Sequence, residues 1–436
     1  MKHKKLTIAA ALVAAMATAT ACGGVNDDAA STDGEEIVLS MLADNNGPTI
    51  EITESIIEAF HASQDRIRLE LETRPPGAEG DNLIKTRLAT GEMSDLFFYN
   101  TGSLLTAIDP ATNLLPLEDE ELKGAFDPSF VTAASHNDQF YGAPMGTVMA
   151  GGMLYNKTVY SDLGLEIPTS WAEFMENNQV IKEAGIDPVI QTFGDTFTSQ
   201  FIQLSDFHNV LQDDPEWADK YTNNEAKFVD QPGIRSFEKM HEVAEAGFLN
   251  RDFASAKLGQ GFEYLVAGTG AHYPMHSSAI AGFLDLADNV AENIGFFGVP
   301  HDDASKTGAT LWPPNAWYIP KSISEEKAEA AKEFMRFMST QEACDAQTEA
   351  QPPTGPYMAT NCEPVSGGLA VTEDVQAYID SGKNSLALEY LSPIKGPNLE
   401  HILVEVGSGM TDPASAAARY DEDVKKQAQQ LGLENW

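Results

Sequence analysis

The most constraining feature of this chain is an alternation of short apolar runs and amphipathic stretches near its N-terminal end. Short apolar runs predict buried strands, whereas apolar residues that recur at helical spacing predict amphipathic helices. Parallel strands need a crossover between them, so this alternation predicts a parallel sheet with helices packed on its faces. The predicted elements are strands at 36–41, 66–72 and 95–99 and helices at 48–62 and 83–90.

Later parts of the chain continue this pattern. Ser170 and Glu173 have the spacing of a capping box, which predicts the start of a helix. An apolar run at 294–300 predicts a further strand. The prolines within 312–320 exclude a helix and predict an extended segment. Residues 324–338 predict a helix that begins with acidic residues, which the helix dipole favours. We therefore expect an α/β protein.

The N-terminus has the features of an export signal. Lys2, Lys4 and Lys5 precede an apolar run at residues 6–17, and small residues follow. This run is shorter than the roughly 20 residues that a membrane-spanning helix needs. We therefore expect residues 1–21 to be a signal peptide that is removed on secretion.

The residues after the apolar run resemble a bacterial lipobox. Residues 19–22 are Ala-Thr-Ala-Cys, and in a lipobox the cysteine is acylated and becomes the mature N-terminus. Cys22 is thus the expected lipid anchor, and ordinary cleavage after Ala21 without a lipid is the alternative. Residues 22–36 are polar and rich in Gly and Asp, which predicts a flexible tether.

Length and charge limit the classes of protein. Without residues 1–21 the chain has 415 residues and a formal charge of −42, because three lysines leave with the signal. This length exceeds what one core usually supports, so two domains of about 200 residues are expected. Nucleic acids and other polyanions would be repelled by such an acidic protein. No segment after the signal is long and apolar enough to cross a membrane.

Two cysteines remain once Cys22 is assigned to a lipid. Cys344 and Cys362 form an even pair in a protein that is expected to enter an oxidising compartment. Closing the loop between them stabilises the fold by about 3 kcal/mol in the chain-entropy model. Their spacing and the scarcity of nearby histidines do not suggest zinc. We therefore expect a structural disulfide.

The sequence lacks the motifs of common catalytic sites. It contains no Gly-x-Ser-x-Gly, no His-Glu-x-x-His and no glycine-rich nucleotide-binding loop. His272 and His276 are four residues apart, but Pro274 opposes a helix and no acidic residue accompanies them. Because Asp and Glu total 66, carboxylate pairs suited to glycoside hydrolysis carry no information. We predict no catalytic residue, no metal site and no cofactor.

Three short segments occur in an informative order. Residues 141–144 are Tyr-Gly-Ala-Pro, residues 154–157 are Leu-Tyr-Asn-Lys, and residues 168–171 are Pro-Thr-Ser-Trp. In order and spacing they resemble the region where the chain crosses between lobes in extracellular solute-binding proteins of family 1. These are the maltose-binding-protein-like receptors that supply ABC importers. Tyr160 stands where that family usually has an aliphatic residue.

The resemblance implies a two-lobed periplasmic-binding-protein fold of type II. Such a fold has mixed, mostly parallel sheets with helices on both faces and a hinge of two or three crossing strands. It would assign residues 37–143 and 316–345 to the first lobe. It would assign residues 144–315 and 346–436 to the second.

Candidate ligand-binding residues follow from two chemical rules and the resemblance. Sugar receptors stack aromatic rings on sugar rings and direct amides and carboxylates at hydroxyl groups. Ligands of open α/β sheets lie beyond the carboxyl ends of strands. Trp317 has an alternative interpretation as part of the hinge core. The predicted ligand-binding residues are Asn45, Asn46, Asn100, Ser103, Phe193, Asp195, Tyr273, His276, Trp312, Asn315 and Trp317.

The resemblance also implies a function. It is that of the substrate-binding component of an ABC importer, which captures an oligosaccharide or related polyol between its lobes and delivers it to a membrane permease. We expect a monomer without enzymatic activity, held outside the bacterial cytoplasmic membrane through a lipid on Cys22. Two alternatives stay open: a lipid-anchored glycoside hydrolase or lyase, and a sensory lipoprotein that binds a membrane partner without transport.

Overall fold

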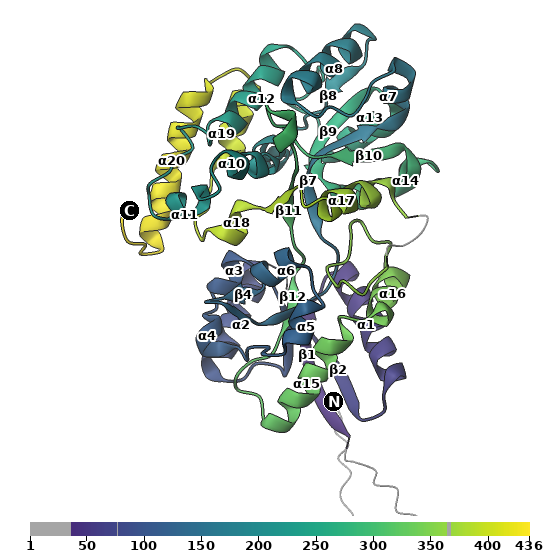
Figure 1. Ribbon diagram of the computed structural model, residues 1–436, viewed down its shortest axis with the longest axis vertical. Helices are drawn as coiled ribbons and strands as arrows, with labels where there is room; N and C mark the ends of the chain where they lie inside the picture. Colours follow the sequence, from purple (N-terminus) through teal and green to yellow (C-terminus); the bar gives the residue numbers. More distant parts are fainter. Residues whose placement is uncertain (1–35, 76, 364–367) are drawn as a thin grey trace, which may run out of the picture. The chain divides into compact units, whose positions relative to one another are not determined.

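Two mixed β-sheets organise the protein in the computed structural model, which describes residues 36–75, 77–363 and 368–436 (Figure 1). The first sheet contains β1 (Ile37–Asp44), β2 (Ile67–Arg74), β3 (Leu96–Tyr99), β6 (Gly142–Pro144) and β12 (Ala316–Tyr318). Its strand order is β2-β1-β3-β12-β6.

The second sheet is formed by the middle and later parts of the chain. It contains β7 (Met149–Asn156), β8 (Asp187–Val189), β9 (Gly270–His276), β10 (Ile294–Phe297), β11 (Ala309–Trp312) and β13 (Asn384–Leu386). Its order is β13-β11-β7-β9-β8, and β10 also pairs with β7. A separate two-stranded hairpin consists of β4 (Ser135–His136) and β5 (Gln139–Phe140).

The first sheet confirms the parallel arrangement that the N-terminal alternation predicts. β1 pairs in parallel with β2 on one side and with β3 on the other. β12 pairs antiparallel with both β3 and β6, so a strand from much later in the chain completes the sheet. The colours in Figure 1 show this return. The extended segment predicted at 312–320 contains the crossing, because β11 ends at Trp312 and β12 begins at Ala316.

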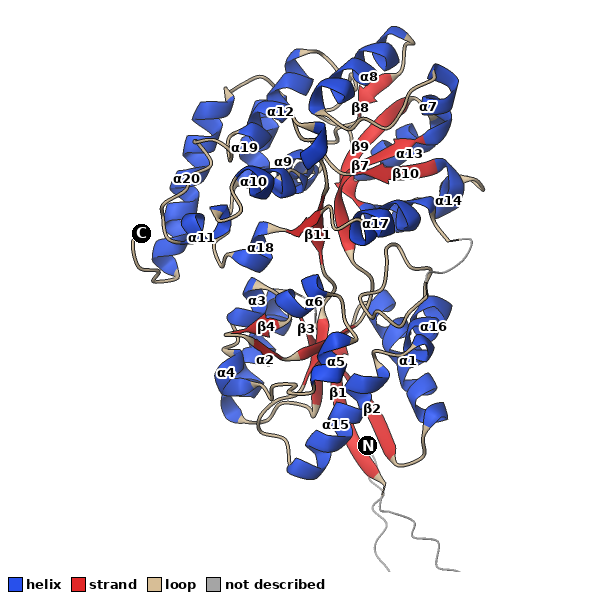
Figure 2. Ribbon diagram, in the orientation of Figure 1, coloured by secondary structure: helices blue, strands red, loops and turns tan. Residues whose placement is uncertain are grey.

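Helices pack around both sheets (Figure 2). Those associated with the first sheet are α1 (Gly47–Ser63), α2 (Ala78–Thr90), α3 (Ser103–Thr106), α4 (Pro110–Asn113), α5 (Glu120–Gly124), α6 (Pro128–Ala133), α15 (Glu325–Phe337) and α16 (Gln341–Ala350). The others are α7 (Lys157–Leu163), α8 (Trp171–Glu183), α9 (Phe201–Ser205), α10 (Phe207–Asp213), α11 (Trp217–Thr222), α12 (Arg235–Glu245), α13 (Leu258–Ala267), α14 (Val290–Asn293), α17 (Ala370–Asp380), α18 (Leu388–Leu391), α19 (Leu399–Gly407) and α20 (Pro413–Gln430). Short 3-10 helices are η1 (Thr196–Gln200), η2 (Ser277–Gly282), η3 (Leu284–Leu286) and η4 (Ala304–Lys306).

Local sequence explains where two of these helices begin. The predicted capping box of α8 is present, because Glu173 N donates to Ser170 Oγ at 3.3 Å and Ser170 N donates to Glu173 Oε2 at 3.2 Å. α2 begins at Ala78, earlier than predicted. Gly77 turns the chain into this helix with φ of 72°, a conformation that glycine adopts without strain. Asp81 in the first turn favours the helix through the dipole.

The predicted disulfide between Cys344 and Cys362 is confirmed. It joins α16 to the loop that follows it. That loop is also held by hydrogen bonds from Thr360 N to Ala125 O at 2.8 Å and from Asn361 Nδ2 to Ser339 O at 3.1 Å. α16 spans the lobe boundary expected at residues 345/346, and Ser55 of α1 donates to Ala346 O at 2.7 Å. Residues on both sides of that boundary therefore pack against elements of the first sheet.

The predicted signal peptide, the tether and the lipid-anchor residue Cys22 lie outside the described residues. Within the described part of the chain, no helix combines the length and the apolar character needed to span a bilayer.

Candidate functional site

The carboxyl ends of the first sheet's parallel strands lie in one row. Asp44 pairs with Arg74 in the register of β1 and β2, and the same register continues through β3 to Tyr99. Tyr99 is in turn paired with Ala316, so Asn315 lies at the same edge. We call Asp44, Arg74, Tyr99 and Asn315 the first rim. In open α/β sheets this is the edge where ligands bind.

A buried ion pair dominates the first rim. Arg74 Nη2 lies 2.9 Å from Asp44 Oδ1, and only 2% of the Arg74 side chain and 18% of the Asp44 side chain are exposed. The guanidinium also donates to Phe98 O at 3.4 Å and lies 5.9 Å from the centre of the Tyr99 ring. A guanidinium can be buried at tolerable cost only where such partners compensate for lost hydration.

Burial changes the acid–base properties of this rim. Loss of hydration raises the pKa of Asp44 above its ordinary value, and the charge of Arg74 opposes that rise while Asp81 adds to it. Burial likewise raises the pKa of Tyr99 to about 12. Tyr99 Oη and Arg74 Nε have no hydrogen-bond partner among the described residues. Of these groups the Asp44 carboxylate is the most exposed and can accept from hydroxyl groups, whereas the Tyr99 and Arg74 side chains are almost fully buried.

Aromatic and neutral polar groups form the corresponding edge of the second sheet. Trp312 ends β11 and His276 ends β9, and their rings are 4.4 Å apart. Gly151 of β7 pairs with His276. A Cβ atom added to Gly151 would lie 2.5 Å from Ser205 Oγ and 2.7 Å from Trp312 Cζ3. Only glycine permits this close approach. We call Gly151, Ser205, His276 and Trp312 the second rim.

The second rim is uncharged at neutral pH. Burial, and to a lesser extent the charge of Lys395, lower the pKa of His276 to about 4. The His276 imidazole therefore stays neutral and keeps one donor and one acceptor nitrogen.

Two short connections bring the rims together. Residues 313–315 join β11 to β12, and residues 145–148 join β6 to β7. Four residue steps span at most about 14 Å, so the end of β11 cannot lie far from the start of β12. Met145 N donates to Asn315 O at 3.0 Å and ties one connection to the other. Tyr390 of α18 donates to Pro313 O at 3.0 Å.

A groove borders this crossing. Its volume is about 360 Å³, and Gly146 and Thr147 of one connection line it. Ile52 of α1 and Gln347 of α16 line it from the first-sheet side, and Ser278 of η2 lines it from the second-sheet side. Elements associated with both sheets therefore line this groove, but no residue of either rim and no predicted ligand-binding residue does.

Five predicted ligand-binding residues lie at or next to the first rim. Asn45 is exposed directly after β1, and Asn46 caps α1 by accepting from Thr49 N at 3.0 Å. Asn100 follows β3, and Ser103 begins α3. Asn315 is half-buried within the crossing. The structure thus brings these five polar residues to one edge.

Two predicted residues, Trp312 and His276, belong to the second rim, and Asp195 lies in the loop after β8. Its carboxylate accepts from Leu258 N at 2.8 Å and binds Lys257 at 3.1 Å. These contacts lower the pKa of Asp195, the Leu258 amide most strongly. Asp195 thus holds the start of α13.

The remaining three predicted residues are aromatic rings inside packed cores. Phe193 is 4% exposed and lies against Gly407. Tyr273 is fully buried, and its hydroxyl is 2.6 Å from Thr192 Oγ1. Trp317 is fully buried near Phe98 and Phe334, with ring centres 5.4 and 6.0 Å away. The three rings are thus enclosed by packing, and Trp312, at 4% exposed, shows as little surface as Phe193. Trp317 occupies the hinge-core position that was its alternative interpretation.

Sequence reasoning missed several residues of the site. Asp44 and Arg74 are the last residues of β1 and β2 at the first rim. Arg74 could have been predicted as a rim residue, because it is a charged residue at the end of an alternating strand, directly before Pro75. Ser205 and Gln203 lie on the short helix α9, and their position beside Trp312 has no sequence signature.

The two histidines considered as a metal pair have different roles. His272 is buried, with Nδ1 2.9 Å from Pro188 O and Nε2 2.7 Å from Tyr160 Oη. Both of its ring nitrogens are therefore engaged. Across residues 36–75, 77–363 and 368–436, no group of three or more His, Cys, Asp and Glu side chains is arranged to hold a metal ion.

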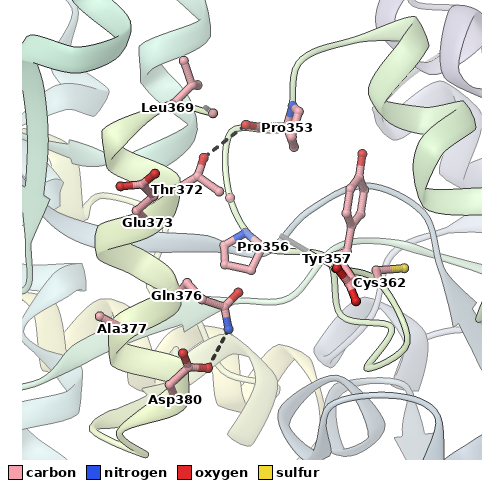
Figure 3. Close-up of a pocket in the computed structure, with 13 residues that line it drawn as sticks. Pro353, Pro356, Tyr357, Cys362, Leu369, Thr372, Glu373, Gln376, Ala377 and Asp380 are labelled. Carbon is pink, nitrogen blue, oxygen red and sulfur yellow. Dashed lines mark hydrogen bonds between the residues drawn. The ribbon is translucent and has the colours of Figure 1, made fainter. Parts of the chain in front are cut away.

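A further cavity of about 220 Å³ lies between α17 and residues 353–363 (Figure 3). Thr372 Oγ1 donates to Pro353 O at 3.1 Å across it. Glu363 and Gly368 line it and border residues 364–367, which are outside the described part of the chain. None of the predicted ligand-binding residues lines this cavity, and we assign no ligand to it.

Comparison with known proteins defines the class. Residues 46–343 match the family model described as bacterial extracellular solute-binding protein, which is more than half of the chain. The chain therefore belongs to this family. The two-lobed α/β fold predicted from the crossing segments is confirmed.

Individual relatives are distant in sequence but similar in fold. A Streptococcus pneumoniae protein named carbohydrate ABC transporter substrate-binding protein is 24% identical over 58% of this chain and 54% of its own length. The chain thus spans about half the length of that curated relative. The apo form of RafE from Streptococcus pneumoniae is 16% identical, with a TM-score of 0.75 over 92% of this chain and 99% of that one. RafE in complex with raffinose is also 16% identical, with a TM-score of 0.69 over 91% and 99%.

Proposed function

We propose that this protein is the substrate-binding component of a bacterial ABC importer and that it captures an oligosaccharide or related polyol between its two lobes. The observation that carries the proposal is the pairing of unlike rims across a short crossing. One rim presents the Asp44–Arg74 pair, and the other presents Trp312 beside neutral polar groups. A sugar offers apolar C–H faces and many hydroxyl groups, so it can use both kinds of surface at once.

The name of the Streptococcus pneumoniae relative and the raffinose bound to RafE support a carbohydrate ligand. In the proposed mechanism the ligand bonds to the first rim and packs against the second. Contacts with both lobes favour a closed arrangement over an open one, which shifts the hinge equilibrium. The closed form is then offered to the permease subunits in the membrane, and the ligand is not chemically altered.

A sugar panel tests the ligand class. Thermal unfolding of the mature chain is measured with mono-, di- and trisaccharides at millimolar concentration, and hits are titrated by calorimetry. At least one oligosaccharide is expected to raise the melting temperature, because a ligand that binds only the folded state stabilises it. If peptides, amino acids or metal ions raise it and no sugar does, the proposed ligand class is wrong.

The same hits separate the proposal from an enzyme. The protein is incubated with each oligosaccharide, and new reducing ends are assayed over a day. The expected result is no product above a heat-denatured control. Sustained release of reducing ends would favour a glycoside hydrolase or lyase instead.

We further propose that the mature protein is a monomer tethered outside the cytoplasmic membrane through a lipid on Cys22. Metabolic labelling with palmitate is expected to mark the wild-type chain and not Cys22→Ala, which should leave the membrane fraction. Light scattering of the soluble Cys22→Ala chain reports its oligomeric state. Equal labelling of both chains would contradict the anchor, and a dimer mass would contradict the monomer.

A further inference from the structure

Three buried polar atoms without a partner among the described residues gather around Trp312. They are Gln203 Oε1, Ser205 Oγ and His276 Nε2. The His276 ring is 4.4 Å from the Trp312 ring. A Cβ atom on Gly151 would lie within 2.7 Å of both Ser205 Oγ and Trp312 Cζ3, so these two side chains meet over this glycine. Gln203 lines the same small cavity as Trp312.

Packing of the fold does not account for the free amide oxygen of Gln203. The residue is only 5% exposed, and an unsatisfied buried polar atom costs about 1–3 kcal/mol. Other buried glutamines of this chain differ in this respect: neither amide atom of Gln191 has a partner among the described residues, whereas Gln347 is paired. Its Oε1 accepts from Gly146 N at 2.7 Å, and its Nε2 donates to Ala343 O at 3.1 Å. What distinguishes Gln203 is that it lines a cavity beside Trp312, so its free oxygen can accept from a group that is not part of the chain.

The cavity beside Gln203 restricts the size of that partner. Its volume is about 30 Å³, with Gln203, Trp312, Glu389 and Lys395 among its lining residues. A space of roughly 10–15 Å³ is enough for one water molecule, so this cavity holds one small polar group and not a second sugar ring. An amide oxygen only accepts hydrogen bonds, so the group must carry an O–H or N–H donor.

We propose that Gln203 is a specificity-determining residue that accepts a hydrogen bond from the hydroxymethyl group of a hexose ring bound against Trp312. The inference rests on the proposed function and adds the class of sugar. A hexopyranose carries this arm, and the corresponding pentopyranose lacks only it. The pentose leaves the cavity unfilled and Gln203 unpaired, which is the situation in which binding sites discriminate strongly.

The experiment compares matched sugars on matched variants. The probes are cellobiose with xylobiose, D-glucose with D-xylose, and D-galactose with L-arabinose, because the pyranose forms of each pair differ only in hydroxymethyl groups. Affinities are measured by calorimetry for the wild-type mature chain, Gln203→Met and Gln200→Met. Methionine keeps the length of glutamine and removes its polar atoms. Gln200 lies on η1 close to Gln203 and donates to Phe197 O at 3.2 Å, so it serves as the control. Thermal unfolding checks that each variant is folded.

The wild-type chain is expected to bind the hexose member of a pair at least tenfold more tightly than its pentose counterpart. Gln203→Met should weaken hexose binding about tenfold and leave pentose binding unchanged, so the preference collapses. Gln200→Met should keep the preference for the hexose. Equal affinity of the wild-type chain for both members overturns this inference, as does an equal loss for both sugars in Gln203→Met. Either result leaves a sugar-binding function standing. A wild-type chain that binds no sugar of the full panel overturns the proposed function as well.

Discussion

The two rims of the candidate site are built on different principles. The first rim is charged and held by an ion pair in which only 2% of Arg74 is exposed. The second rim is neutral and consists of an aromatic ring with polar atoms that the described residues leave unpaired. Both rims leave polar atoms unpaired among the described residues, but only the first is also held together by an ion pair. Substitutions should therefore affect folding at the first rim and ligand affinity at the second.

The largest expected effect is on stability and concerns Trp317, which lies just after the crossing. Trp317→Ala is expected to lower the free energy of unfolding by roughly 4 kcal/mol, because it removes a fully buried ring from the hinge core. Urea unfolding followed by circular dichroism measures the loss. The control Trp436→Ala, at the C-terminus, should cost clearly less. A loss below about 1 kcal/mol for Trp317→Ala would mean that this ring does not support the hinge.

The second largest expected effect is the loss of stability on breaking the Asp44–Arg74 ion pair of the first rim. Arg74→Ala should cost about 3 kcal/mol of stability, because it leaves a partly buried carboxylate without its partner. Arg68→Ala on the same strand removes an exposed pair, in which Arg68 is 56% exposed, and should cost less than about 1 kcal/mol. Equal costs in urea unfolding would show that burial does not distinguish the two arginines.

The pH dependence of stability should have opposite signs at the two rims. His276 has a folded-state pKa of about 4, below its ordinary 6.5, so its contribution is fully present above pH 6.5 and is lost as the pH falls toward 4. Between pH 7 and pH 5 the loss is on the order of 2 kcal/mol. The raised pKa of Asp44 acts the other way, because protonation at lower pH relieves the cost of burying its charge.

Urea unfolding at several pH values checks these signs. His276→Asn should flatten the decline below pH 6.5, and Asp44→Asn should steepen it. His401→Asn, at a side chain that is 63% exposed, serves as the control substitution. A profile that His276→Asn does not alter would contradict the assignment.

The smallest expected effect is on ligand affinity at the second rim. Trp312→Phe should weaken binding of the best sugar about tenfold, or roughly 1.4 kcal/mol, because it reduces the aromatic surface at the strand end. The variant should remain folded, since it keeps an aromatic ring in place. Calorimetry measures the affinity. Unchanged affinity would place the ligand away from Trp312.

Much of the fold was predictable because it depends on short stretches of sequence. Apolar spacing predicts α1, the strand alternation predicts the parallel pairing of β1 with its neighbours, and the Ser170–Glu173 spacing predicts the cap of α8. The disulfide was predictable because only two cysteines remained for an oxidising compartment. Four polar candidates, Asn45, Asn46, Asn100 and Ser103, reached one edge for a similar reason, since residues that follow parallel strands collect at the same side of a sheet. Asn315 reaches that edge because it precedes the antiparallel strand β12.

Within the candidate site, residue type alone does not predict which side chains belong to the rims and which to the core; the pairing of the strands determines this. Trp312 and Trp317 flank the same Asn315, yet Trp312 lies beside His276 and Trp317 is enclosed by Phe98 and Phe334. The difference arises because each strand pairs with partners from distant parts of the chain. Arg74 meets Asp44, and Gln203 meets Trp312, only through such pairings and packing.

Local periodicity and capping thus determine which elements form, and the order of the crossing segments identifies the family. Only the packed structure determines which side chains are buried and which polar atoms stay unpaired. The physical reason is that burial and hydrogen bonding depend on neighbours in space, and in this chain those neighbours are supplied by segments far apart in sequence.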